Sequence, residues 1–145
     1  MKWIICLSIL LLLGCAQATN LDYEMSVLCS EVGHQIEYTS DIGKDYCQSP
    51  DETILKGTGD CEDMTILFMY LCNKELGIKT ELLIVDVGDT FHCISYYNGI
   101  YYDPTLHGIY TKLFEGSKII FKCNYDVAMI YATRFYSKGE NKWLN

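Results

Sequence analysis

A thiol surrounded by carboxylates stands at the head of a long apolar stretch of the sequence. Cys61 is flanked by Asp60, Glu62 and Asp63, and apolar residues dominate from there to Leu76. A cysteine thiolate is the attacking group in many acyl-transfer reactions, but neighbouring negative charge disfavours it. A nucleophile at this position therefore requires a cation or hydrogen-bond donors from elsewhere in the fold.

His92 and Asp103 could supply the base and the group that orients it. They lie in two segments rich in β-forming residues, and the intervening Asn98-Gly99 is a strong signal for a two-residue hairpin turn. With these turn residues, Ile94 faces Asp103, and His92 lies two positions from Ile94 along the same strand. Residues that face each other, or that are two apart on one strand, share a side of the sheet. His92 and Asp103 are thus predicted to be diagonal neighbours, roughly 7 to 8 Å apart at the backbone.

The thiol is predicted to lie in the first turn of a buried helix. Asp60 suits the N-cap and Asp63 the third helical position, near the capping-box pattern, and Gly77 suits the stop. Apolar side chains occupy nearly every side of the helix from Met64 to Leu76, which is typical of a helix buried on most faces.

A helix start favours a thiolate only weakly by itself. Its unpaired backbone N–H groups suit a thiolate and an oxyanion, but the helix dipole contributes only about 0.3 to 1 kcal/mol. A close imidazolium of His92 would lower the pKa of Cys61 far more. We expect Asp60 and Asp63 to bind helix amides, and Glu62 to turn to water. The cation at His92 then dominates over the screened carboxylates.

The remaining pattern predicts helices first and an antiparallel sheet afterwards, which is the order of an α+β domain. An amphipathic helix is expected over Leu21 to Tyr38, either continuous or broken near Gly33, and a short helix from Pro50 that ends before Gly57. Gly57 to Gly59 is predicted to be a flexible turn. Strands are expected at Lys79–Val87, Thr90–Tyr97, Ile100–Asp103 and Lys118–Tyr125. The pattern of residues 126–136 fits a final strand or a helix equally well.

These segments together resemble the transglutaminase-like cysteine proteins, a superfamily of papain-like ancestry that includes bacterial cysteine peptidases. The resemblance covers about Ile36 to Thr105. It rests on Ile36-x-Tyr38-x-x-Asp41, Glu52-Thr53-Ile54-Leu55, Gly59-Asp60-Cys61-x-Asp63, Leu67-Phe68, Leu76-Gly77-Ile78, Phe91-His92 and Tyr102-Asp103-Pro104-Thr105. The family order is cysteine, histidine, aspartate, which Cys61, His92 and Asp103 match. The implied fold is papain-like, with N-terminal helices and a buried catalytic helix packed on an antiparallel sheet.

The resemblance implies a cysteine hydrolase with a Cys-His-Asp triad. Cys61 would attack an amide carbonyl, His92 would take its proton and pass it to the leaving amine, and Asp103 would hold the imidazole tautomer. Release of the acyl group to water makes an amidase or peptidase, which we favour, and release to an amine makes a cross-linking transglutaminase. A non-catalytic binding module with the same fold is a further alternative. The implied substrate is a protein or peptide, no cofactor is implied, and no second oxyanion donor can be assigned.

The first 18 residues have the layout of a secretory signal. One basic residue, Lys2, precedes an apolar run from Trp3 to Leu13 and then small residues. Leu12-Leu13-Gly14-Cys15 resembles a bacterial lipobox, in which the signal ends at residue 14 and Cys15 carries a lipid. Ala16-Gln17-Ala18 fits ordinary cleavage before a domain at residues 19–145. We expect an exported protein, either a periplasmic or cell-envelope lipoprotein anchored to a membrane or a secreted one.

The charge balance argues against nucleic acid as a partner. The chain has 11 basic and 19 acidic residues, and loss of Lys2 with the signal leaves a net charge of −9. Phosphate binding requires a basic surface, which this composition does not provide. The sequence leaves the oligomeric state open.

Six cysteines follow the signal region, and an even number in an exported protein suggests disulfides. They are Cys29, Cys47, Cys61, Cys72, Cys93 and Cys123. Cys29 with Cys47 and Cys93 with Cys123 are the pairings we consider, whereas pairing of all six would make the chain a disulfide-stapled structural lipoprotein. No two cysteines have the C-x-x-C spacing and the histidines are scattered, so no metal site is expected. His34 and His107 are predicted to be surface or packing residues.

Overall fold

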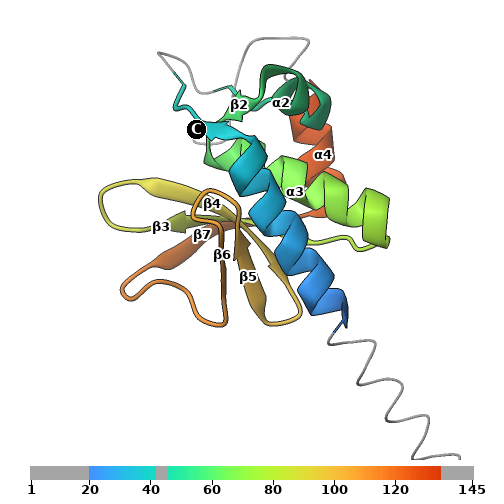
Figure 1. The fold of residues 1–145 in the computed structure, drawn as a ribbon. Helices are drawn as coiled ribbons and strands as arrows, with labels where there is room; N and C mark the ends of the chain where they lie inside the picture. The colour runs from blue at the N-terminus through green and yellow to red at the C-terminus, as the bar shows by residue number, and fades with distance from the viewer. Residues whose placement is uncertain (1–19, 42–45, 135–145) are drawn as a thin grey trace, which may run out of the picture.

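Five antiparallel strands form the main sheet, and the helices gather on one side of it (Figure 1). The structure, a computed structural model, describes residues 20–41 and 46–134. Its elements are an N-terminal helix over residues 20–35, β1 (Glu37–Tyr38), α2 (Pro50–Lys56), β2 (Thr58–Gly59), α3 (Cys61–Leu76), β3 (Glu81–Asp86), β4 (Phe91–Tyr97), β5 (Ile100–Asp103), β6 (Gly108–Tyr110), β7 (Lys118–Asn124) and α4 (Tyr125–Arg134). The sheet order is β6-β5-β4-β3-β7, with helices before the sheet. The α+β class predicted from the sequence is therefore confirmed.

The hairpin between β4 and β5 has the predicted register. Tyr97 pairs with Ile100, and the pairing continues inward from there without a bulge. Asn98 and Gly99 have φ angles of 48° and 89°. Positive φ at both central residues is the requirement of a type I′ turn, whose twist matches that of the flanking strands. This turn fixes which residues of β4 and β5 share a side of the sheet.

Helix α3 is the central element of the core. It begins after Asp60 and ends at Gly77, whose φ of 70° closes the last turn in the left-handed region. One side of α3 packs with the N-terminal helix and with Tyr102 of β5, whose ring stacks on Phe68 at 5.2 Å between centroids. Another side packs on Leu82 of β3, Cys93 of β4 and the α4 residues Ala128 and Ala132. The predicted burial on most faces is confirmed.

Three local predictions need correction. The N-terminal helix ends at residue 35 and runs unbroken through Gly33, and Glu37–Tyr38 instead pairs in parallel with Thr58–Gly59. The expected flexible turn is thus a short strand, because the carbonyls of Gly57 and Gly59 accept the N–H groups of Glu37 and Thr39, both at 2.9 Å. Strand β6 was not predicted, since it is only three residues long. The ambiguous segment after residue 125 is helical in its described part, through Arg134.

None of the six cysteines forms a disulfide, so the pairings considered from the sequence are wrong. Cys29 packs in the core cluster under the N-terminal helix, whereas Cys47 packs in the cluster under α4. Cys93 and Cys123 lie on β4 and β7, which flank β3 on opposite sides. Two strand spacings separate their backbones by about 10 Å, beyond the roughly 7 Å limit for a disulfide.

Across residues 20–41 and 46–134, the helices are too short or too polar to cross a membrane. The predicted signal, its two cleavage sites and Cys15 lie outside the described residues. These remain predictions from the sequence.

Candidate active site

His92 and Asp103 meet on one side of the sheet, as the hairpin register predicts. His92 Nε2 lies 2.7 Å from Asp103 Oδ2, and the other carboxylate oxygen accepts the backbone N–H of Leu106 at 3.2 Å. The side chain of Asp103 is fully buried, whereas that of His92 retains 16% exposure. A buried carboxylate with a hydrogen bond to each of its oxygens holds the imidazole ring in one orientation.

The hydrogen bond to Asp103 assigns different roles to the two ring nitrogens of His92. When Asp103 is ionised, Nε2 carries the proton that it donates, and Nδ1 presents a lone pair. Among the described residues, no hydrogen bond engages Nδ1. His92 therefore keeps Nδ1 available as a proton acceptor, and its side chain is partly exposed.

The turn that follows Asp103 packs closely against the N-terminal helix. A Cβ at Gly33 would lie 2.4 Å from the carbonyl oxygen of Pro104 and 2.8 Å from His107 Nδ1, so only glycine allows this approach. His107 stacks edge-on against His34, with ring centroids 4.6 Å apart. Both histidines are exposed, which confirms the prediction that they are surface or packing residues.

Cys61 is the first residue of α3 and lies against β4. Its partly buried side chain packs against the cluster that contains Cys93. The backbone N–H of Cys93 faces the sulfur and acts to lower the pKa of the Cys61 thiol. Cys93 directly follows His92 in β4, so the sulfur lies one residue along the strand from the predicted base. Within the described residues, however, no hydrogen bond joins Cys61 to His92.

Glu62 does not turn to water, and the expectation that it would do so is wrong. Its Oε2 lies 3.4 Å from Cys61 Sγ and accepts the thiol proton. Burial is the main cause that raises the pKa of the Cys61 thiol, and the negative charges of Glu62 and Asp60 raise it further. Glu62 is partly buried, so its carboxylate lies beside the thiol instead of extending into solvent. Cys61 is therefore protonated in this arrangement.

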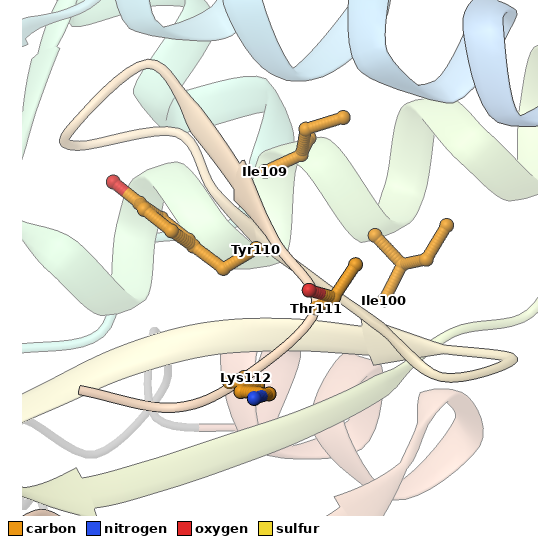
Figure 2. A pocket seen from close by; sticks show the side chains of 5 residues that line it. All are labelled: Ile100, Ile109, Tyr110, Thr111 and Lys112. Carbon is orange, nitrogen blue, oxygen red and sulfur yellow. The ribbon is translucent and has the colours of Figure 1, made fainter. Parts of the chain in front are cut away.

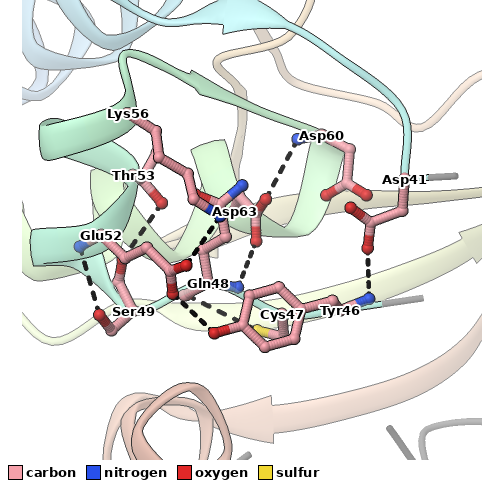
Figure 3. Close-up of polar contacts among 10 residues, drawn as sticks. All are labelled: Asp41, Tyr46, Cys47, Gln48, Ser49, Glu52, Thr53, Lys56, Asp60 and Asp63. Atoms are coloured by element: carbon pink, nitrogen blue, oxygen red, sulfur yellow. Dashed lines mark hydrogen bonds and ion pairs between the residues drawn. The ribbon is translucent and has the colours of Figure 1, made fainter. Parts of the chain in front are cut away.

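The side chain of Asp63 is bound to backbone amides (Figure 3). Its two carboxylate oxygens accept the N–H of Gln48 at 2.6 Å and the N–H of Asp60 at 3.3 Å. The prediction that Asp63 binds amides is confirmed, although one of them belongs to the segment before α2. Burial, followed by the charge of Asp60, raises the pKa of Asp63 to about 7. Asp63 thus carries only part of a negative charge at neutral pH.

A polar network holds the segment before α2 against the start of α3 (Figure 3). The hydroxyl of Tyr46 donates to Glu52 at 2.7 Å, and Lys56 pairs with the same carboxylate at 2.7 Å. Ser49 caps α2 by accepting the N–H of Glu52. Together with the bond from Gln48 to Asp63, these contacts fix the helix end that carries Cys61.

Thr65 and Gln48 were not predicted as site residues from the sequence. Thr65 Oγ1 donates to the carbonyl oxygen of Cys93 at 3.0 Å and is fully buried. A threonine within an apolar helix is normally a packing residue, and its place four residues after Cys61 is the one signal that the sequence offered. Gln48 lies in a loop whose contact with Asp63 depends on tertiary packing.

One surface hollow lies beside β5 and β6. A cavity of about 440 Å³ is lined by Ile100, Ile109, Tyr110, Thr111 and Lys112 (Figure 2). Burial, and then the charge of Asp103, raises the pKa of Tyr110, so one residue of the lining is within electrostatic reach of the candidate site. In the part of the chain that the structure describes, no group of three or more His, Cys, Asp or Glu side chains could hold a metal ion.

Comparison with known proteins adds little to this geometry. No protein-family model matches the chain, and no curated protein matches it. A solved structure of LapG from Legionella pneumophila is similar, with a TM-score of 0.47 and 22% sequence identity. The alignment covers 59% of this chain and 56% of LapG, so the chain spans little more than half of that neighbour's length. The likeness is too remote to assign a family, and the chemistry must be argued from the residues themselves.

Proposed function

We propose that this protein is an exported cysteine hydrolase of the transglutaminase-like type, which cleaves amide bonds in a protein or peptide. The supporting observation is the 2.7 Å bond between His92 and the buried carboxylate of Asp103. The bond leaves Nδ1 of His92 for proton transfer, and His92 directly precedes Cys93, whose backbone N–H contacts the Cys61 sulfur. The family resemblance of the surrounding motifs supports the same chemistry.

In the proposed reaction, the Cys61 proton passes to His92 Nδ1 as the sulfur attacks the substrate carbonyl carbon. The carbonyl oxygen becomes an oxyanion, for which the backbone N–H at the start of α3 is a suitable donor. His92 then gives the proton to the leaving amine as the C–N bond breaks. Water, deprotonated by His92, then attacks the thioester carbon; the C–S bond breaks, the acyl group leaves as a carboxylic acid, and His92 returns the proton to the Cys61 sulfur. Asp103 stays ionised throughout and stabilises the imidazolium.

The bond from Cys61 to Glu62 must break before this proton transfer. In the structure, the thiol proton points to Glu62 rather than to the imidazole. The described arrangement therefore corresponds to a resting state, in which a side-chain rotation at Cys61 or Glu62 precedes the attack.

A non-catalytic binding module is the second candidate, and a specific observation favours it. Burial and the charge of Glu62 raise the pKa of Cys61, which is the opposite of what a thiolate nucleophile requires. In such a module, the bond between His92 and Asp103 would serve only to stabilise the hairpin.

The rate of Cys61 alkylation by iodoacetamide as a function of pH separates these candidates. The measurement follows the Cys61 peptide by mass spectrometry, because five other cysteines are described, all of them buried. The hydrolase predicts a reactive fraction of Cys61 below pH 7 that disappears in His92→Ala. Identical profiles in the wild-type protein and His92→Ala would contradict the hydrolase and support the module.

The acceptor of the acyl group requires a separate experiment. Hydrolysis predicts release of new termini or ammonia from a protein substrate such as casein, with no requirement for an added amine. Incorporation of a fluorescent primary amine into casein in preference to hydrolysis would instead identify a cross-linking transglutaminase.

Export and lipidation form part of the proposal and rest on the sequence alone. Expression of the full chain in a bacterial host with labelled palmitate should label the wild-type protein and leave Cys15→Ala unlabelled. An unlabelled wild-type protein that is cleaved after Ala18 would favour ordinary secretion.

A further inference from the structure

Thr65 makes an unusual hydrogen bond for a threonine within a helix. A helical threonine hydroxyl commonly bonds the carbonyl one turn earlier, which here belongs to Cys61. Instead, Thr65 Oγ1 donates its single proton to the carbonyl oxygen of Cys93 on β4, at 3.0 Å. Both Thr65 and Cys93 are buried, so the bond is shielded from water.

The backbone of Cys93 is held by α3 at two points. Its carbonyl accepts from Thr65, and its N–H faces the Cys61 sulfur. Cys61 and Thr65 are four residues apart, so they project from the same face of α3. Since Cys93 directly follows His92, both contacts hold α3 to β4 at the residue next to the predicted base.

A second buried hydroxyl on β4 provides an internal comparison. Ser95, two residues beyond Cys93, is fully buried. Its hydroxyl donates to the hydroxyl oxygen of Thr80 at 2.8 Å and lies within hydrogen-bond distance, 3.2 Å, of the carbonyl oxygen of Glu81. Its bonds join β4 to the β3 side of the sheet and do not involve α3. Loss of either hydroxyl leaves a buried partner unsatisfied, so both losses should lower the melting temperature by a similar amount. Of these two hydroxyls, only that of Thr65 joins β4 to α3.

We propose that Thr65 is a positioning residue that sets the distance between the Cys61 sulfur and the His92 imidazole by tying α3 to the Cys93 carbonyl. This inference rests on the proposed function, since it assumes that the sulfur and the imidazole exchange a proton. Thr65 itself contacts no reacting atom. Proton transfer depends steeply on such distances, and a displacement of about 1 Å can cost as much as 100-fold in rate.

The test compares the pH profile of Cys61 alkylation in Thr65→Val, Thr65→Ser and Ser95→Ala. Thr65→Val keeps the side-chain shape but removes the donor, and Thr65→Ser keeps the donor. We expect Thr65→Val to reduce the His92-dependent alkylation below pH 7 by about tenfold or more. Thr65→Ser should retain the wild-type profile. Ser95→Ala should also retain it, although its melting temperature falls about as much as that of Thr65→Val.

Three outcomes would overturn the inference. A wild-type profile in Thr65→Val, or an equal shift in Ser95→Ala, would show that Thr65 contributes only to stability. If Thr65→Val does not fold, Thr65→Ala replaces it, because the smaller side chain leaves room for a water to bond the Cys93 carbonyl.

If His92→Ala leaves the wild-type profile unchanged, the proposed function fails and this inference fails with it. A His92-dependent profile that is unaffected at Thr65 overturns this inference alone.

Discussion

The two halves of the candidate site are prepared to different degrees. On the hairpin, His92 and Asp103 are already bonded, with the carboxylate buried and both of its oxygens occupied. At the tip of α3, the Cys61 thiol is bonded to Glu62, and burial raises its pKa. The proposed base is preorganised, whereas the proposed nucleophile is held in its protonated form. In the proposed hydrolase, activation therefore has to come from a change at the helix tip, because the hairpin needs none.

The largest expected effect is at the sulfur itself. Cys61→Ala should abolish amide hydrolysis, measured with a library of fluorogenic peptides, because no other described cysteine lies at the start of α3. Its chemical unfolding curve should remain close to that of the wild-type protein, since a partly exposed thiol at a helix start contributes little packing. Gross unfolding of Cys61→Ala would show that the helix tip has a structural role.

The next largest effect tests whether Asp103 orients the imidazole of His92, as their hydrogen bond indicates. Asp103→Asn should lower kcat/KM for the same peptides by about 10³- to 10⁴-fold, because an amide in place of the carboxylate favours the wrong tautomer of His92. The amide oxygen can still accept the N–H of Leu106, so the turn should be kept. A loss below about tenfold would show that Asp103 is not required to orient His92.

Replacement of Glu62 is expected to have a smaller effect, and to increase the reactivity of Cys61 rather than reduce it. Glu62→Gln removes a negative charge beside the thiol, which lowers the pKa of Cys61. The alkylation profile of Cys61 should move to lower pH, with a rate about two- to tenfold higher at neutral pH.

Glu31→Gln is the matched control for Glu62→Gln, since it removes the same charge from an exposed position on the N-terminal helix. It should leave the alkylation profile unchanged. An equal shift in both variants would attribute the effect to net charge, and no shift in Glu62→Gln would show that burial alone protonates the thiol.

Replacement of Asp63 should have the smallest effect on the rate of hydrolysis. Its main effect should be on the free energy of unfolding. The pKa of Asp63 is about 7 in the folded protein and 3.8 ordinarily, so the folded state keeps a proton that the unfolded state releases. The stability linked to this proton is complete below about pH 4 and is lost as pH rises through 7. Asp63→Asn cannot titrate and should show a flatter decline in unfolding free energy between pH 4 and 7, measured with urea. Equal slopes in the two proteins would contradict the raised pKa.

The sequence by itself determined the hairpin half of the site. The Asn98-Gly99 turn and the two-residue period of strands fix which side chains share a side, so the meeting of His92 and Asp103 follows from fewer than 15 consecutive residues. The start of α3 was equally local, because a cap and an N3 carboxylate act within one helical turn. Both predictions depended on contacts between residues that are close in the chain.

Only the tertiary structure decided how the helix tip meets the sheet. The contacts of Thr65 and Cys61 with Cys93 join residues about 30 positions apart, and Asp63 binds Gln48 from another segment. The direction of Glu62 and the absence of disulfides among the six described cysteines likewise depend on which elements pack together. Such contacts are set by the summed burial of several helices and strands, and no local pattern records that sum.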